Sequence, residues 1–316
     1  MPNRMIDRAA YSTGRYFFEE LIGRVDVSYE ANYFPMRAGR AYSICTVHDL
    51  AFRDDRFRRR VLTEEAAWWS ARADKITTVS QASKKVILAK VKGVREDQVE
   101  VIYGAADERF NRAFAKRELK RVRDVHGLPE RYFLYVGEAI ARKNLPMLIR
   151  GFQMVRARSP EVFLVMVGFG QSELLDLIRS TDPGCDLANV RAIGYVARED
   201  LPSLYHAARA LVWPSRDEGF GLPLVEAMST GQLIVTADIP ASREIAGGDA
   251  IFFDPDRPDE IRDRLLSALN MSDEERSGLI ETGVRRVNER FSWKTSARAM
   301  LELFAEGFRA SGVRRK

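Results

Sequence analysis

The residue types best suited to chemistry gather in one stretch, SRDEGFGLPLVEAMSTG, at residues 215–231. Its carboxylates are Glu218 and Glu226, and the glycines between them favour a tight turn. Pro223 suits the first turn of a helix, and the apolar run ALVWP at 210–214 is typical of a buried strand. The stretch therefore predicts a strand, a glycine turn and a helix, with one acid before the helix and one inside it.

Such a turn suits a phosphate group. Glycines at 219 and 221 let the backbone approach a ligand closely, and the N–H groups at the start of a helix near Leu222 attract negative charge. Glu226, one turn into the helix, cannot usefully face a phosphate, but its oxygens can accept hydrogen bonds from a hydroxyl pair such as that of a ribose. Glu218 would then lie at the other end of a diphosphate-linked ligand.

Simpler explanations exist for the parts taken singly. Many α/β proteins use a glycine turn merely to turn, and a buried glutamate can cap a neighbouring helix. Glu218 and Glu226 could also be the carboxylate pair of a sugar hydrolase. Glycosidases, however, normally present such acids from open clefts without a phosphate-binding turn, and release of free sugar without nucleotide dependence would support that reading.

Short apolar runs rich in β-forming residues alternate with helical patterns along the chain. This alternation predicts parallel sheets covered on both faces. The polar, basic segment 113–130 separates two such series, so we expect α/β domains at 1–112 and 131–290 and a terminal segment at 291–316. The expected strands are 25–30, 42–47, 75–80, 98–103, 132–137, 162–168, 190–195, 210–214, 233–237 and 250–254.

Composition excludes several classes of protein. The 316 residues carry 50 basic and 45 acidic side chains, and the resulting net charge of +5 is too small for a dedicated nucleic-acid binder. Cys45 and Cys185 have no metal-ligand or disulfide-framework spacing. No apolar run approaches the roughly 20 residues of a membrane span, and the polar start lacks a signal region, so we expect a cytoplasmic protein. The basic segment 53–62 suits either an anionic membrane surface or the solvated start of a helix.

The whole string from Ser215 to Gly231 resembles the Glu-x7-Glu motif of family 4 glycosyltransferases, which have the GT-B fold of two Rossmann-like, doubly wound domains. The resemblance extends from about residue 25 to the end of the chain. YVGEAIARKNLPMLIRGF and VMVGFGQ resemble the opening of the donor-binding domain, and VRAIGYVAREDLPSLYHAA resembles the segment whose loop, around Tyr195 and Val196, packs on the nucleotide base. FSWKTSARAMLELF resembles the terminal helices that cross back onto the first domain.

The resemblance implies transfer of a sugar from a GDP- or UDP-linked donor to a hydroxyl of a carbohydrate or lipid-linked sugar, in polysaccharide or glycolipid synthesis. It implies retention at the anomeric carbon, no metal and no cofactor. It further implies that two cations stabilise the leaving diphosphate. The implied catalytic residues are His48, Arg142, Lys143 and Glu218, and the implied donor-binding residues are Gly168, Val196, Gly219, Phe220, Gly221, Leu222 and Glu226. Without that family context, His48 would read as a structural histidine.

The chain also departs from the family pattern. Glu138 stands where many members have an arginine or a small polar residue, and it would repel a diphosphate unless it turns away or pairs with Arg142. Only four strands are expected before Asp107, so the first domain is expected to be incomplete. A misassigned start, a truncated gene and a surviving but divergent first domain are the alternatives. That leaves open a non-catalytic protein that binds nucleotide sugar or a partner subunit. The DPD run of Asp254 and Asp256 is assigned to a turn, with Asp256 in a turn or capping role, rather than to a metal.

Overall fold

The computed structural model describes residues 23, 25–31, 41–48 and 71–314. The chain forms two compact units, one of residues 1–104 with 293–316 and the other of residues 105–292. The basic segment 53–62 lies outside the described residues. The division between the two units, after residue 104, falls eight residues before the expected end of the first domain at residue 112.

The predicted linker 113–130 contains a helix instead. Helix α5 (Lys116–His126) packs against α8 (Leu201–Ala207) within the second unit. Its Val122 is buried, and Glu118 accepts a hydrogen bond of 3.0 Å from the Ser203 hydroxyl. The sequence of this segment resembled a solvated linker because its many charged residues lie on the outer side of the helix and few side chains face inward.

A four-stranded parallel sheet in the order β1-β2-β3-β4 makes up the core of the first unit's described part. Alternate residues of β2 point to opposite faces, so Ile44 packs with Leu303 of α13 and Cys45 packs with Ile87 of α4. Both faces are thus covered, as the apolar strands predict. The elements are β1 (Val27–Glu30), β2 (Tyr42–Val47), β3 (Lys75–Thr78), α4 (Gln81–Lys90), β4 (Val99–Val101) and α13 (Trp293–Arg314).

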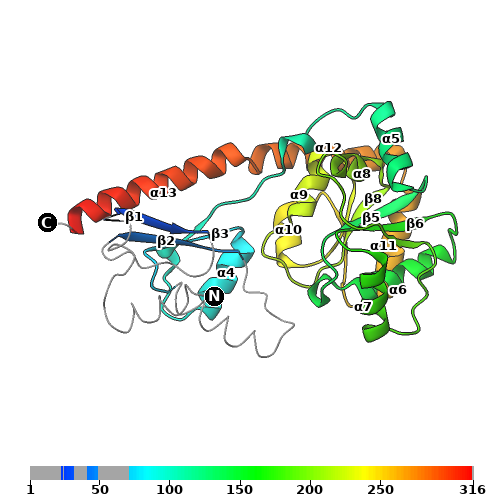
Figure 1. The fold of residues 1–316 in the computed structure, drawn as a ribbon, viewed down its shortest axis with the longest axis horizontal. Coiled ribbons are helices and arrows are strands. Elements are labelled where there is room, and N and C mark those ends of the chain that lie inside the picture. Colours follow the sequence, from blue (N-terminus) through cyan, green and yellow to red (C-terminus); the bar gives the residue numbers. More distant parts are fainter. Residues whose placement is uncertain (1–22, 24, 32–40, 49–70, 315–316) are drawn as a thin grey trace. The chain divides into compact units, whose positions relative to one another are not determined.

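The terminal helix α13 lies along the sheet of the first unit, as predicted (Figure 1). The Tyr42 hydroxyl donates a hydrogen bond of 3.1 Å to Glu306, and the Ser296 hydroxyl donates one of 2.6 Å to the Tyr103 carbonyl. The rings of Tyr29 and Phe304 meet edge to face. The last helix is therefore a packed part of the first unit.

The second unit contains a six-stranded parallel sheet in the order β10-β9-β8-β5-β6-β7. From β5 the chain moves to β6 and β7, and it then returns to the other side of β5 for β8, β9 and β10. The order reverses between β5 and β8, and ligands of such sheets bind at that point, beyond the carboxyl ends of the strands. The strands are β5 (Tyr132–Val136), β6 (Phe163–Val167), β7 (Val190–Ala192), β8 (Ala210–Trp213), β9 (Ile234–Ala237) and β10 (Ile251–Phe253).

Helices lie on both sides of this sheet (Figure 1). Central strands are buried on both faces, and Leu134, Val165 and Leu211 are fully inaccessible to solvent. The ten strands expected from the sequence are all present, with the same or shorter bounds, and β4 and β7 have half the expected length. The remaining helices are α6 (Leu145–Arg156), α7 (Gln171–Thr181), α9 (Leu222–Ser229), α10 (Pro240–Ala246), α11 (Pro258–Asn270) and α12 (Asp273–Arg290), with single 3-10 turns at Glu96–Gln98, Glu108–Phe110 and Ala141–Lys143.

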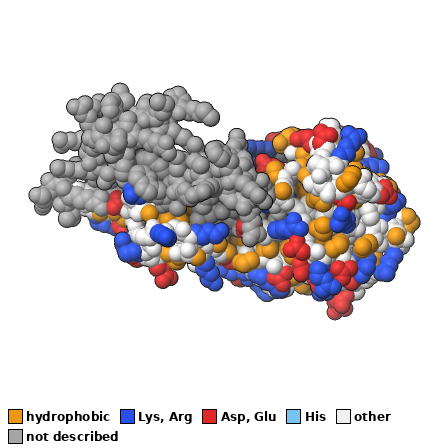
Figure 2. Space-filling view, turned by 90° about the horizontal axis from the view of Figure 1, so that it is seen from below, with side chains coloured by type: hydrophobic (Ala, Val, Ile, Leu, Met, Phe, Trp, Pro, Cys, Tyr) orange, Lys and Arg blue, Asp and Glu red, His pale blue; other side chains and the backbone are white. Residues whose placement is uncertain are grey.

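Basic and acidic side chains are interspersed on the described surface that Figure 2 shows. Such mixing gives no broad field of one sign on that face. Among the helices in the described ranges, none has both the length and the apolar composition needed to cross a bilayer.

Candidate active site

Three of the predicted catalytic side chains meet at the switch point of the second sheet. Arg142 and Lys143 lie in the 3-10 turn that follows β5, and Glu218 lies in the loop that follows β8. The two loops are joined where the Arg216 N–H donates a hydrogen bond of 3.0 Å to the Arg142 carbonyl. The topology therefore brings together residues that are more than seventy positions apart in the sequence.

One carboxylate is shared by two cations. The Arg142 Nη1 lies 2.7 Å from Glu218 Oε2, and the Lys143 Nζ lies 2.6 Å from Glu218 Oε1. The Lys143 and Glu218 side chains are each 8% exposed and that of Arg142 is 21% exposed. Burial lowers the pKa of Lys143, although the Glu218 charge opposes that shift. Two positive charges against one negative charge leave an excess that favours an anion.

Asn144 joins the turns around this cluster, and it was not predicted from the sequence. Its backbone is left-handed, with φ of 56°, a conformation that asparagine tolerates better than most residues. The buried side-chain amide donates hydrogen bonds to the Pro214 carbonyl at 3.3 Å and to the Pro255 carbonyl at 2.6 Å. Its position directly before the Leu-Pro start of α6 is a helix-boundary signal that could have identified it.

The glycine turn between Glu218 and α9 has the predicted form. Gly221 precedes the first residue of α9, Leu222, and its φ of 102° is a left-handed conformation that L side chains rarely adopt. Gly219 is buried, while Leu222 is 41% exposed. Phe220 anchors the turn by packing edge to face on Phe291, with ring centroids 5.8 Å apart. The strand, turn and helix order places a helix amino terminus beside the cluster formed by Arg142, Lys143 and Glu218.

Glu226 has a different partner from Glu218. Its carboxylate accepts a hydrogen bond of 2.7 Å from the hydroxyl of Tyr205, a fully buried residue of α8 that no sequence pattern singled out. Burial raises the pKa of Glu226 to about 7, and the Tyr205 hydrogen bond partly opposes that shift. Glu226 can therefore exchange a proton near neutral pH, and the two acids of the motif are bound to separate groups.

Further predicted donor-binding residues follow β6 and β7. Gly168, with φ of 111°, directly follows β6, and a Cβ atom there would collide with the Gly137 carbonyl oxygen. Glycine is thus required for the close approach of the loops after β5 and β6. Val196 is half-buried after β7, and the neighbouring Tyr195 is 86% exposed, so its ring is available as a stacking surface.

His48 belongs to the first unit, where it follows β2. Its side chain is exposed, and its Nε2 lies 2.9 Å from the Ala31 carbonyl oxygen. That contact gives one ring nitrogen a hydrogen-bond partner, as expected of a histidine with a purely structural role. The role near a donor sugar stays a prediction.

Glu138 does not pair with Arg142. Its side chain is exposed, and its carbonyl accepts a hydrogen bond of 2.9 Å from the Tyr135 hydroxyl. The Arg142 guanidinium binds Glu218 and, at 3.3 Å, the Asp217 carbonyl. The repulsion expected between Glu138 and a diphosphate is therefore reduced by exposure to water rather than by an ion pair.

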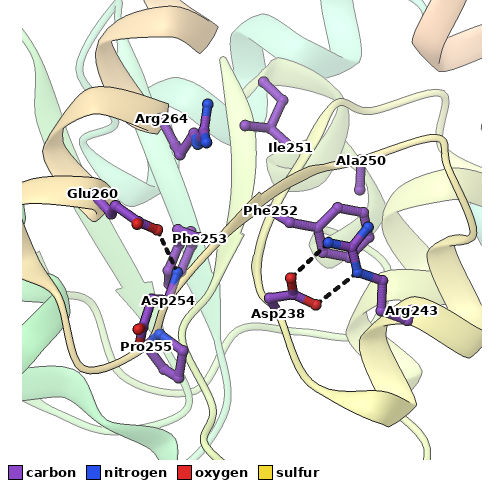
Figure 3. A pocket seen from close by; sticks show the side chains of 10 residues that line it. All are labelled: Asp238, Arg243, Ala250, Ile251, Phe252, Phe253, Asp254, Pro255, Glu260 and Arg264. Carbon is purple, nitrogen blue, oxygen red and sulfur yellow. Dashed lines mark hydrogen bonds and ion pairs between the residues drawn. The ribbon is translucent and has the colours of Figure 1, made fainter.

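A cavity of about 700 Å³ lies along the edge strand β10 (Figure 3) and contains none of the predicted donor-binding residues. Asp254 lines it and accepts the Asp256 backbone N–H at 2.9 Å, while the Asp256 carboxylate pairs with Arg216. The Asp254 side chain, rather than that of Asp256, therefore makes the hydrogen bond that stabilises this turn, and the capping role predicted for Asp256 was wrong. Within the described ranges no group of three His, Cys, Asp or Glu side chains is placed to hold a metal.

More than half of the chain matches a known protein family. Residues 116–286 match the family described as glycosyl transferases group 1. The chain is 36% identical over 168 residues to O-antigen chain mannosyltransferase B of Escherichia coli, covering 52% of this chain and 42% of that protein. It is 26% identical over 307 residues to the serotype-specific mannosyltransferase WbdA of Escherichia coli, covering 93% of this chain and 36% of that protein. This chain thus spans less than half the length of either relative.

Solved structures share the fold. The crystal structure of Anabaena HepE in complex with UDP and glucose superposes with a TM-score of 0.70 at 20% identity, covering 84% of this chain and 72% of that one. A glycosyltransferase from Rickettsia africae superposes with a TM-score of 0.71 at 15% identity, covering 96% of this chain and 80% of that one. The arrangement of two parallel-sheet units predicted from the sequence is confirmed.

Proposed function

The chain belongs to the glycosyl transferases group 1 family, and from that premise we propose that it transfers a sugar from a nucleotide-diphosphate donor to a hydroxyl of a growing polysaccharide. The observation that carries this proposal is the pair of cations, Arg142 and Lys143, beside the amino terminus of α9. Clustered cations and helix N–H groups are the usual means of binding a diphosphate.

The donor is proposed from the names of the relatives. Two relatives are mannosyltransferases, and HepE was crystallised with UDP and glucose. We therefore propose a GDP- or UDP-linked sugar, with a mannosyl group as the first to test, and a carbohydrate or lipid-linked acceptor. Cytoplasmic location and contact with an anionic membrane surface stay predictions.

Each part of the donor has a proposed partner in the second unit. Arg142 and Lys143 bind the diphosphate together with the N–H groups at the start of α9. Glu226, inside that helix, accepts hydrogen bonds from the ribose hydroxyls, because its carboxylate lies beyond the turn that holds the phosphates. Tyr195 and Val196 provide the surface for the base. Sugar and diphosphate thus lie toward Glu218 and the ribose toward Glu226.

The proposed reaction breaks the bond between the anomeric carbon and the diphosphate oxygen. The acceptor oxygen forms its new bond to the anomeric carbon on the same face, so the configuration is retained, and its proton passes to the departing diphosphate oxygen. Negative charge on the diphosphate grows as this bond breaks. Arg142 and Lys143 therefore stabilise the transition state more than the bound donor, and no protein base or metal is required by the step.

The proposed role of Glu218 depends on whether the donor is bound. Without a donor its carboxylate holds both cations at hydrogen-bond distance, and with the diphosphate in place those cations acquire a new anionic partner. We propose that Glu218 then accepts hydrogen bonds from hydroxyls of the donor sugar.

Glu218→Gln is expected to lower kcat/KM for the sugar nucleotide by roughly 10- to 150-fold, the range for hydrogen bonds to a charged group. Binding of the free nucleoside diphosphate, which has no sugar, should not weaken, because a neutral glutamine leaves the charges of Arg142 and Lys143 available to the phosphates. Steady-state kinetics and calorimetry check the two values. An equal loss for both ligands would remove the proposed contact with the sugar.

Sugar-nucleotide affinity is expected to rise by up to about tenfold between pH 6 and pH 8, because the pKa of Glu226 is about 7 and only its ionised form accepts from both ribose hydroxyls. GDP-mannose and UDP-glucose suit this calorimetric titration, since their diphosphates do not change charge over that range. Glu226→Gln should give a flat profile. A flat profile in the unmodified chain would contradict the assignment.

The proposed function is tested by thermal unfolding with GDP, UDP, ADP, their sugar derivatives and the corresponding monophosphates. A ligand at 100 times its dissociation constant stabilises the folded chain by about 2.7 kcal/mol. We expect one nucleoside diphosphate to raise the melting temperature and its monophosphate to do so much less. Stabilisation by free oligosaccharide alone would favour a hydrolase, and stabilisation without turnover would favour the non-catalytic alternative.

A further inference from the structure

We propose that Trp213 is a positioning residue for Lys143, and that its indole face holds the ammonium group ready for the departing diphosphate; the inference rests on the proposed transferase function. The Lys143 Nζ lies 4.1 Å from the centroid of the Trp213 ring. Trp213 is the last residue of β8, and Lys143 lies in the turn after β5, so the two meet at the switch point of the sheet.

The indole of Trp213 is buried and packs against other aromatic rings. Trp213 is 1% exposed and stacks on Tyr135 of β5, with ring centroids 5.8 Å apart and planes 18° from parallel. Tyr135 packs in turn against Phe169 at 6.2 Å. Aromatic side chains of two neighbouring strands therefore pack around the indole that Lys143 contacts.

Packing alone does not explain a tryptophan at this position. Buried indoles normally find an acceptor for Nε1, but the Trp213 Nε1 is buried and has no hydrogen-bond partner in the described part of the chain. An unsatisfied buried donor is destabilising, and an aliphatic or phenyl side chain would avoid that cost. Tryptophan, however, is the side chain whose ring face attracts a cation most strongly.

A ring face holds Lys143 in a way that a carboxylate cannot. Glu218 neutralises the ammonium charge, whereas the indole stabilises the ammonium in a dry site and leaves its full charge available to the diphosphate. When the Glu218 carboxylate turns to the donor sugar, Trp213 remains under Lys143. The indole ring of Trp213 thus takes the place of the water that burial removes from the Lys143 ammonium. It keeps the ammonium protonated and in place.

The test weakens the ring face without changing the shape of the side chain. Tryptophan at position 213 alone is replaced by analogues with one to four ring fluorines, and melting temperatures confirm that the variants are folded. We expect kcat to fall stepwise, by roughly 5- to 30-fold for the tetrafluoro ring, with little change in donor KM. In a Lys143→Ala background the same series should change kcat by less than twofold. No effect in the unmodified chain, or an equal effect in both backgrounds, would overturn the proposal.

A second measurement needs no donor, so it separates failure of this inference from failure of the transferase proposal. Reductive 13C-methylation gives the pKa of Lys143 by NMR, with the resonance assigned from Lys143→Arg. The pKa is expected to fall by about one unit in Trp213→Leu and by less in Trp213→Phe. Glu218, Arg142 and Glu138, which also act on this pKa, are unchanged in both variants. An unchanged pKa in folded Trp213→Leu would show that the indole only fills space.

Discussion

Replacing Lys143 by alanine is expected to lower turnover by about 10²- to 10³-fold, the usual cost of removing one donor that stabilises transition-state charge. The Lys143 ammonium is buried, shares Glu218 with Arg142 and faces the loop before α9. Its charge acts in a partly dry site, where electrostatic interactions are stronger than in water. Because diphosphate charge grows during departure, the loss should fall mainly on kcat.

The measurement is steady-state kinetics with the true donor, together with calorimetry of the free nucleoside diphosphate. Affinity for the nucleoside diphosphate should fall by less than kcat. Lys120→Ala is the matched control, because Lys120 forms only an exposed ion pair with Asp124 on α5 of the same unit. If Lys143→Ala kept full turnover, or lost affinity and turnover in equal measure, the proposed role in the transition state would be wrong.

Glu226→Gln is expected to weaken nucleotide binding by roughly 10- to 150-fold at pH 8 and, at the same pH, to stabilise the ligand-free chain. The folded pKa of Glu226, about 7, lies above its ordinary value of 4.5. The carboxyl's contribution to stability is therefore fully present below about pH 4.5 and is lost as the pH rises through 7. The difference corresponds to roughly 3 kcal/mol of stability at pH 8.

The stability change is measured by denaturant unfolding of the ligand-free protein at pH 5.5 and pH 8. The change in affinity is measured by calorimetry with the nucleoside diphosphate. Glutamine removes the charge and keeps the shape, so its stabilising effect should be larger at pH 8. Glu161→Gln, which alters an exposed carboxylate paired with Arg131, is the control and should change neither quantity. Unchanged nucleotide affinity in Glu226→Gln would remove the ribose contact, and a destabilising effect at pH 8 would contradict the raised pKa.

The sheets could be predicted from the sequence because their strands are apolar on both faces. The run YSICTV is buried along its whole length, and the first four residues of YFLYVG are buried, so neither run resembles a surface segment. Helix α5 was missed for the opposite reason, since Val122 is its one buried residue and the charged side chains dominate the pattern. The boundary between the units was misplaced for the same reason, because α5 joins the second unit.

The site was predictable only in part. The motif and the family resemblance identified Arg142, Lys143 and Glu218, and the structure brings them together. The Glu226 contact with Tyr205 and the Trp213 contact with Lys143 join residues that no local pattern connects. They depend on which strands are neighbours at the switch point and on how α8 packs beside α9. Sequence spacing carries no direct information about either.

The most direct test of sugar transfer is 1H NMR of the chain incubated with GDP-mannose or UDP-glucose and a mannose-terminated oligosaccharide. We expect nucleoside diphosphate to appear in step with a new glycoside that has the anomeric configuration of the donor, and both signals to be nearly absent with Lys143→Ala. Release of free sugar without a glycoside, a product of inverted configuration, or full activity in Lys143→Ala would contradict the account.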